Sequence, residues 1–134
     1  MVLEASVFVA AISPSEVHHA QARKFWEGYP DDESFVVPAL FRTEVIAALA
    51  RRGESDEFLD TVDALVSGPR FYAVPLDAAL LDGATTVARQ ARLRAYDAVY
   101  VALASSRGDG LCTLDSEILH KARDVLPNLS VTVP

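Results

Sequence analysis

The stretch AYDAVYVALA, residues 95–104, holds one charged side chain, that of Asp97, in an otherwise apolar and aromatic run. A helix that is apolar around nearly its whole circumference belongs in the interior of a fold. We therefore expect a central helix from Ala95 to Arg107, ended by the segment Gly108–Gly110. An ionised carboxylate in such surroundings is unfavourable unless another group neutralises it, so Asp97 is the first candidate functional residue.

Short apolar runs typical of buried strands alternate with amphipathic segments along the rest of the chain. The expected strands are Val2–Ala5, Phe35–Val37, Phe71–Val74, Leu111–Leu114 and Ser130–Val133. The other expected helices are Val7–Ile12, one that ends at Gly28 with Ser15 as its N-cap, Pro38–Arg52, Glu54–Val66, one that ends at Arg92 with Asp77 as its N-cap, and Ser116–Val125. This alternation, without internal repeats, predicts a three-layer α/β/α fold with a mostly parallel central sheet, in one domain over residues 1–134.

Composition and charge exclude several classes of protein. The chain has 134 residues, of which 51% are hydrophobic, and a net charge of −7. This charge argues against binding nucleic acid by bulk electrostatics, so any contact with RNA must be local. No apolar run reaches the roughly 18 residues that cross a bilayer, and the N-terminal residues lack a signal-peptide pattern, so we expect a cytoplasmic protein without membrane association. The single cysteine, Cys112, is expected in the core of a strand.

Three further carboxylates lie in apolar surroundings: Glu4 in VLEASV, Glu44 in LFRTEVI and Asp115 in LCTLD. In a parallel α/β sheet, the carboxyl ends of the strands and the N-termini of the following helices face the same edge. We therefore expect these three side chains and that of Asp97 to meet in one pocket. Such a cluster repels itself, and a hard cation with a preference for oxygen ligands, Mg²⁺ or Mn²⁺, would supply the compensating charge.

Ordinary structural roles explain the same residues taken one at a time. Glu44 can pair with Arg42 or with Arg51. Asp97 can stabilise the N-terminus of its helix through the helix dipole, and Asp115 can cap the helix that follows it. The hypothesis of a shared site therefore depends on all four carboxylates together.

Polar and basic neighbours of these carboxylates suggest supporting roles. Ser6 and Thr113 each lie two residues from an acidic position, where they either orient a carboxylate or bond the backbone at a strand end. Arg42 precedes Glu44 by two residues and is a candidate RNA-binding residue. For Arg51 and Arg52, the preference of a helix C-terminus for cations is the favoured interpretation.

The remaining histidines and aromatic residues are expected to have structural roles. His18, His19 and His120 lack metal-ligand spacing, because adjacent residues of a helix point to different faces. Trp26 and Tyr29 are expected to pack against the core or a partner, although stacking on RNA is an alternative.

Four segments of the chain, in order and spacing, resemble the PIN-domain ribonucleases, and specifically the short VapC-like toxins of toxin–antitoxin pairs. The segments are VLEASVFVA (2–10), VPALFRTEVIAAL (37–49), LRAYDAVYVALA (93–104) and LCTLDSEIL (111–119). The resemblance spans nearly the whole chain and agrees with the α/β fold expected from periodicity.

The resemblance implies a function and a set of partners. In this family an acidic quartet binds one or two divalent ions, Mg²⁺ or Mn²⁺, which activate water for the hydrolysis of an RNA phosphodiester. It implies that Glu44, Asp97 and Asp115 occupy three of the metal-binding and catalytic positions, with Glu4 at the fourth. It also implies a homodimer and a separate antitoxin protein as partner.

Glu4 departs from the family pattern, which places Asp at this position. The longer side chain carries its carboxylate one methylene farther, whereas Mg²⁺ requires near-ideal octahedral geometry at about 2.0–2.1 Å. Three outcomes are open: Glu4 binds the ion directly, binds it through water, or makes the chain a poor nuclease. The alternative function is therefore a weak or inactive PIN module that acts by binding RNA or an antitoxin.

Overall fold

The computed structural model describes residues 1–134 and contains one five-stranded sheet with the strand order β3-β2-β1-β4-β5. The elements are β1 (Val2–Leu3), α1 (Ala5–Ile12), α2 (His19–Gly28), β2 (Phe35–Pro38), α3 (Phe41–Arg51), α4 (Asp56–Val66), β3 (Phe71–Val74), α5 (Ala78–Ala91), α6 (Ala95–Arg107), β4 (Leu111–Cys112), α7 (Ser116–Val125) and β5 (Val131–Thr132). Every pair of neighbouring strands is parallel. The predicted α/β/α class is confirmed, and the sheet is parallel throughout.

Strand β1 lies at the centre of the sheet and sets the register of its neighbours. Val2 pairs with Val36 of β2 on one side and with Leu111 of β4 on the other. All residues of β1, β2 and β4 are buried, as expected for a parallel sheet covered on both faces. The carboxyl ends of β1 and β4 therefore lie side by side at one edge of the sheet.

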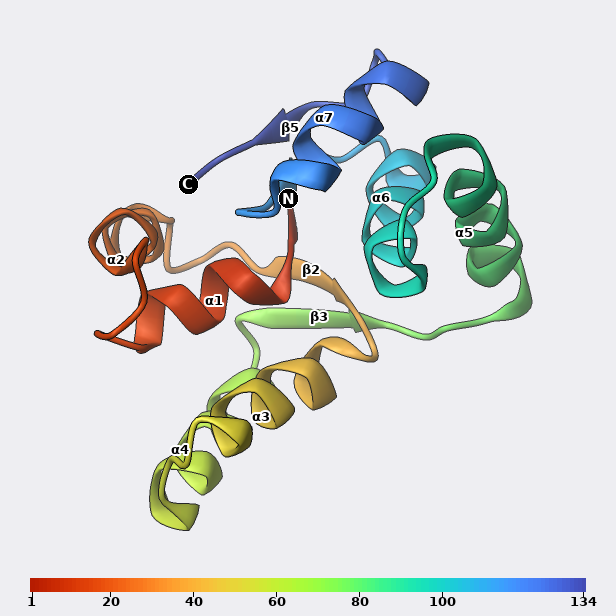
Figure 1. The fold of residues 1–134 in the computed structure, drawn as a ribbon. Helices are drawn as coiled ribbons and strands as arrows, with labels where there is room; N and C mark the ends of the chain where they lie inside the picture. The colour runs from red at the N-terminus through yellow and green to blue at the C-terminus, as the bar shows by residue number, and fades with distance from the viewer.

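Helices cover the sheet in two groups (Figure 1). Helices α1 and α2 pack together on one side of the strands, and α5 and α6 pack together on the other. Helix α7 packs against α5 and α6, while α3 and α4 form an antiparallel pair that extends away from the sheet. None of the seven helices combines the length and the apolar content that a membrane span requires.

The core forms around α6, as the sequence AYDAVYVALA predicts. Seven consecutive residues of this helix, Ala98–Ala104, are buried. On the opposite face, aromatic rings pack on one another: the ring centroids of Phe8 and Trp26 are 5.2 Å apart, and those of Tyr29 and Phe35 are 4.0 Å apart. Trp26 and Tyr29 thus pack against the core.

Cys112 is fully buried in β4, as predicted. Burial in these surroundings raises the pKa of its thiol to about 12. A thiol with such a pKa stays protonated and is a poor nucleophile, so Cys112 has a packing role.

Several expected boundaries differ from the structure. Strands β4 and β5 are shorter than expected, α4 begins at Asp56 instead of Glu54, and α5 ends at Ala91 instead of Arg92. Ala5 belongs to α1, because Glu4 caps this helix immediately after β1. Ser15 does not cap α2, which begins at His19, where the imidazole Nδ1 lies 2.8 Å from the Ala10 carbonyl oxygen. Pro38 is the last residue of β2 and pairs with Val74 of β3. Helix α3 therefore begins at Phe41, three residues after the expected start at Pro38.

Candidate active site at the carboxyl edge of the sheet

The four candidate carboxylates all come from elements that end or begin at the carboxyl edge. Glu4 follows β1 directly, and Asp115 lies between β4 and α7 as the N-cap of α7. Glu44 is in the first turn of α3, and Asp97 is in the first turn of α6. The topology thus places all four at the edge where ligands of open α/β sheets bind.

Glu4 is buried, with 8% of its surface exposed, and its carboxylate accepts several hydrogen bonds. Oε1 accepts from the backbone N–H of Ser6 at 3.0 Å, while Oε2 accepts from the Ser6 hydroxyl and from the Thr113 hydroxyl, the latter at 3.3 Å. Burial raises the pKa of Glu4, these hydrogen bonds oppose the rise, and the charge of Asp97 adds to it. Both hydroxyls predicted to support the site therefore contact the same carboxylate.

Glu44 bonds to neither arginine that the sequence offers as its partner. Its Oε2 accepts a hydrogen bond of 2.5 Å from the phenol of Tyr100, a buried residue of α6. Burial raises the pKa of Glu44 to about 7, the Tyr100 hydrogen bond opposes the rise, and the charges of Glu4 and Asp97 add to it. Glu44 is thus electrostatically coupled to two of the other three carboxylates.

Arg94, in the connection before α6, joins Asp97 to Asp115. Its Nε donates to Asp97 Oδ2 at 2.8 Å, and its Nη2 donates to Asp115 Oδ2 at 2.7 Å. The Arg94 side chain is 69% exposed, whereas those of Asp97 and Asp115 are 13% and 23% exposed. Burial raises the pKa of Asp97, Arg94 opposes the rise, and the charges of Asp115 and Glu117 add to it.

Asp115 also has the structural role that the sequence allowed. Its Oδ1 accepts from the backbone N–H groups of Glu117 at 2.7 Å and Ile118 at 3.2 Å, which caps α7. The backbone N–H of Asp115 donates to the Thr113 hydroxyl at 3.0 Å. Because Thr113 also donates to Glu4, this one hydroxyl connects two of the acidic positions.

The four carboxylates do not all line one cavity. Glu4 and Glu44 line a cavity of about 330 Å³ together with Glu16, Arg51 and Arg52, which we call the Glu4 cavity. Asp115 and Arg94 line a second cavity of about 670 Å³, and Asp97 lines neither. Asp97 nevertheless lies near enough for its charge to raise the pKa of both Glu4 and Glu44.

The carboxylates of this edge have the chemistry that a hard cation requires, but no three of them are grouped closely enough to form a metal site. All four offer carboxylate oxygens, the ligands that Mg²⁺ and Mn²⁺ prefer, and three of them are destabilised as anions by burial. No three His, Cys, Asp or Glu side chains, however, are grouped as a metal site. Arg94 is the cation that contacts Asp97 and Asp115, so it would compete with a divalent ion for Oδ2 of each aspartate.

Arg42 and the histidines lie outside this arrangement. Arg42 Nε and Nη2 donate to both carboxylate oxygens of Asp63 in α4, at 2.5 and 2.7 Å, so Arg42 links α3 to α4. An imidazole nitrogen of His120 lies 2.6 Å from the carbonyl oxygen of Ser116 in its own helix. The RNA contact predicted for Arg42 would require this guanidinium to leave Asp63.

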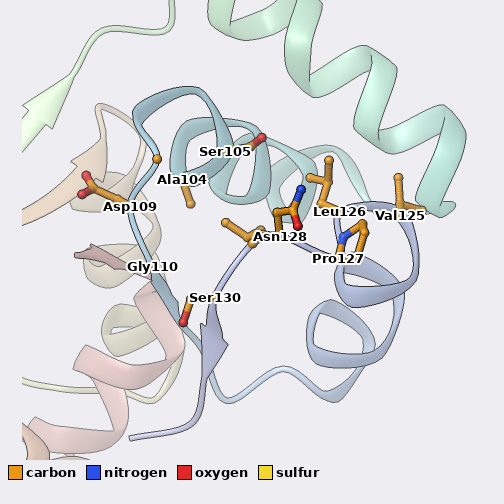
Figure 2. Close-up of a pocket in the computed structure, with 11 residues that line it drawn as sticks. Ala104, Ser105, Asp109, Gly110, Val125, Leu126, Pro127, Asn128 and Ser130 are labelled. Carbon is orange, nitrogen blue, oxygen red and sulfur yellow. The ribbon is translucent and has the colours of Figure 1, made fainter.

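A further cavity of about 510 Å³ lies at the opposite edge of the sheet, near the starts of β4 and β5 (Figure 2). Its single carboxylate, Asp109, pairs with Arg107 at 3.2 Å. The other lining groups are backbone, apolar side chains and the small polar side chains of Ser105, Asn128 and Ser130. This cavity lacks a group of converging ionisable residues, so the carboxyl edge is the candidate active site.

Two residues of the site were missed by sequence reasoning. Arg94 precedes Asp97 by three residues, a spacing at which oppositely charged side chains interact. Tyr100 lies in the middle of an apolar helix, where a buried phenol normally requires a hydrogen-bond partner. Both signals are local. Neither identifies the distant partner, which is Asp115 for Arg94 and Glu44 for Tyr100.

Comparison with known proteins gives a consistent result. The family model described as PIN domain matches residues 1–124. A search of curated proteins finds no match. Similar solved structures include the Mycobacterium tuberculosis toxin VapC20, described as cleaving the sarcin-ricin loop, with a TM-score of 0.75, 16% identity, and coverage of 88% of this chain and 92% of that one.

Two further solved structures show the same likeness. A toxin–antitoxin complex from Klebsiella pneumoniae has a TM-score of 0.73 and 14% identity, and the match covers 98% of this chain and 94% of that one. FitAcB from Neisseria gonorrhoeae has a TM-score of 0.72 and 13% identity, with coverage of 97% and 94%. At these identities the likeness shows a shared fold.

Proposed function

This chain belongs to the PIN domain family, and on that premise we propose that it is a divalent-metal-dependent endoribonuclease that hydrolyses RNA phosphodiester bonds. The observation that carries the proposal is the electrostatic coupling of buried carboxylates at the carboxyl edge. Burial and mutual repulsion raise the pKa values of Glu4, Glu44 and Asp97 together. Perturbed carboxylates at one edge of an α/β sheet are a typical feature of active sites.

Each residue has a role in this proposal. Glu4, Glu44, Asp97 and Asp115 would hold Mg²⁺ or Mn²⁺, which when bound supplies activation of a water molecule and charge compensation at the attacked phosphate. The hydroxyls of Ser6 and Thr113 orient Glu4. Arg94 neutralises Asp97 and Asp115 in the absence of an ion and would compete with one for their Oδ2 atoms.

An RNA cleavage assay with two substitutions tests the proposal. The purified chain, Asp97→Asn and Glu4→Asp are incubated with structured and single-stranded RNA under Mg²⁺ or Mn²⁺. Asp97→Asn removes one anionic ligand and should reduce cleavage by about 100-fold or more. Undiminished cleavage by this variant would show that the activity does not come from these carboxylates, and an EDTA-treated sample is the control for metal dependence.

A second candidate function is a PIN module that is weak as a nuclease and acts by binding RNA or an antitoxin. Two observations favour it: Glu4 already has hydrogen-bond donors on both oxygens, and Arg94 already neutralises Asp97 and Asp115. Glu4→Asp separates the two candidates, because the shorter side chain restores the family residue. Cleavage that rises in this variant would identify a site damaged by Glu4, whereas unchanged or lower cleavage would show that Glu4 is competent.

We also propose that the chain is the toxin of a toxin–antitoxin pair and forms a homodimer. The support is the PIN family match together with the fold shared with the toxin VapC20 and with a toxin–antitoxin complex. Light scattering on the purified chain, alone and with the product of an adjacent small gene, tests both points. A mass that stays at the 14.5 kDa of one chain would contradict the dimer.

A further inference from the structure

Arg51 is the basic residue of the Glu4 cavity that has no acidic partner. Its side chain makes no ion pair or side-chain hydrogen bond, whereas its neighbour Arg52 donates from Nη2 to Glu16 Oε1 at 2.5 Å. Arg42, the other arginine of α3, is held by Asp63. The end of α3 therefore has one guanidinium without an acidic partner, in the same cavity as Glu4 and Glu44.

We propose that Arg51 binds a backbone phosphate of the RNA strand, one that neighbours the phosphodiester to be cleaved. This inference rests on the proposed ribonuclease function and adds to it a substrate-positioning residue. A guanidinium suits the role because its planar fork can donate two parallel hydrogen bonds to phosphate oxygens. A chain with a net charge of −7 needs such a local contact to hold an RNA strand.

The geometry of α3 links Arg51 to the carboxylate side of the cavity. Glu44, Ala47, Ala48 and Arg51 are spaced at three, four and seven residues, so they lie on one face of the helix. At a rise of 1.5 Å per residue, Arg51 lies about 10 Å beyond Glu44 along the helix axis. Ala47 and Ala48, which have small side chains, line the cavity between Glu44 and Arg51.

An acidic segment of a partner protein is the competing ligand for Arg51. Three carboxylates, Glu4, Glu16 and Glu44, line the same cavity and would repel the side chains of such a segment. Those carboxylates would repel further phosphates of an RNA strand as well, and a divalent ion held by Glu4 and Glu44, as proposed above, would offset that repulsion. RNA is the ligand that agrees with the proposed function, and an acidic peptide is the alternative outcome of the test.

RNA binding measured separately from cleavage tests the proposal. Fluorescence anisotropy of a labelled single-stranded RNA 12-mer is recorded in EDTA, with Arg51→Gln, Arg51→Lys and Arg89→Gln in the full chain. Arg89 is the matched control, because it is also in the last turn of a helix, is exposed and has no ion pair. Thermal unfolding of each variant checks that the fold is retained.

Arg51→Gln should weaken RNA binding by about tenfold and reduce the slope of log K against log salt by about 0.7, the loss expected for one phosphate contact on a single strand. Arg51→Lys should recover part of the affinity, and Arg89→Gln should bind like the unmodified chain. Equal affinity and salt slope in Arg51→Gln and the unmodified chain would overturn the proposal.

Two further outcomes separate this inference from the proposed function. If Arg51→Gln loses affinity for RNA while Asp97→Asn cleaves normally, the phosphate contact stands and the carboxylate site does not. If Arg51→Gln loses affinity only for a labelled oligoglutamate peptide and keeps its affinity for RNA, Arg51 binds an acidic protein segment and the proposal is wrong.

Discussion

The partial burial of Glu44 makes the stability of the fold depend on pH. Its pKa is about 7 in the folded chain, against an ordinary value of 4.5, mainly because the side chain is partly buried. The folded state therefore holds the proton more tightly than the unfolded state does. The free energy of unfolding should fall as pH rises from about 4.5 to about 7, the window in which the two states differ in protonation.

Glu44→Gln should therefore stabilise the metal-free chain at pH 8 and have little effect at pH 5. After allowance for solvent screening at this half-buried position, we expect a gain of about 1 kcal/mol at pH 8, or about 3–5 °C in Tm for a chain of this size. The measurement is thermal unfolding in EDTA at both pH values. Glu54→Gln, which removes an exposed acid without an ion pair, is the control; an equal gain in that variant would point to net charge as the cause.

The candidate site residues also stabilise the helices that carry them, so the proposed catalytic roles and the structural roles fall on the same side chains. Glu4 caps α1 and Asp115 caps α7, each through its side-chain carboxylate. A cap contributes about 0.5–2 kcal/mol to stability. The side chains proposed to hold an ion are thus partly fixed in place by the helices that they begin.

Substitutions at Asp115 should separate these two roles. Asp115→Ala removes the cap of α7 and should lower stability by about 1 kcal/mol, whereas Asp115→Asn keeps an acceptor at the N-cap and should be nearly neutral. Both variants lose the charge, so both should lose RNA cleavage. Thermal unfolding and the cleavage assay together measure the difference.

Asp77→Ala is the matched control for this test. Asp77 caps α5 by accepting from the backbone N–H of Leu80 at 2.9 Å and lies outside the site. This variant should be destabilised like Asp115→Ala and should still cleave RNA. Cleavage retained by Asp115→Asn would show that the charge of Asp115 is dispensable.

At the scale of the whole molecule, Arg94 connects two crossover segments at the carboxyl edge. It lies between α5 and α6, and it bonds Asp97 at the start of α6 and Asp115 at the start of α7. The same guanidinium would compete with a divalent ion for these carboxylates. Arg94 therefore stabilises the edge when no ion is bound and opposes the ion when one is present.

Arg94→Gln should lower the Tm of the EDTA-treated chain by a few degrees, because two partly buried carboxylates lose their counter-charge. The rise in Tm on adding Mg²⁺ should be larger than in the unmodified chain and should occur at several-fold lower Mg²⁺ concentration, because the competing cation is gone. Thermal unfolding across a Mg²⁺ titration measures both effects without reference to activity.

Arg92→Gln is the control for Arg94. Arg92 lines the same cavity and has no acidic partner. Its substitution removes the same charge from the same region and should leave the Mg²⁺ response close to that of the unmodified chain. Identical responses of the two variants would mean that general electrostatics, and not the bridge to Asp97 and Asp115, controls ion binding.

The sequence by itself determined the architecture and the edge at which the carboxylates gather. Helices α6 and α7 and strand β3 begin and end at the predicted residues, because periodicity, caps and chain breaks depend on neighbours within a few positions. The tertiary structure alone decided which groups meet. Tyr100 bonds Glu44 across 56 residues of sequence, Thr113 bonds Glu4 across 109, and Arg94 bonds Asp115 across 21. Such contacts depend on how side chains pack when distant elements come together, and no local pattern specifies that packing.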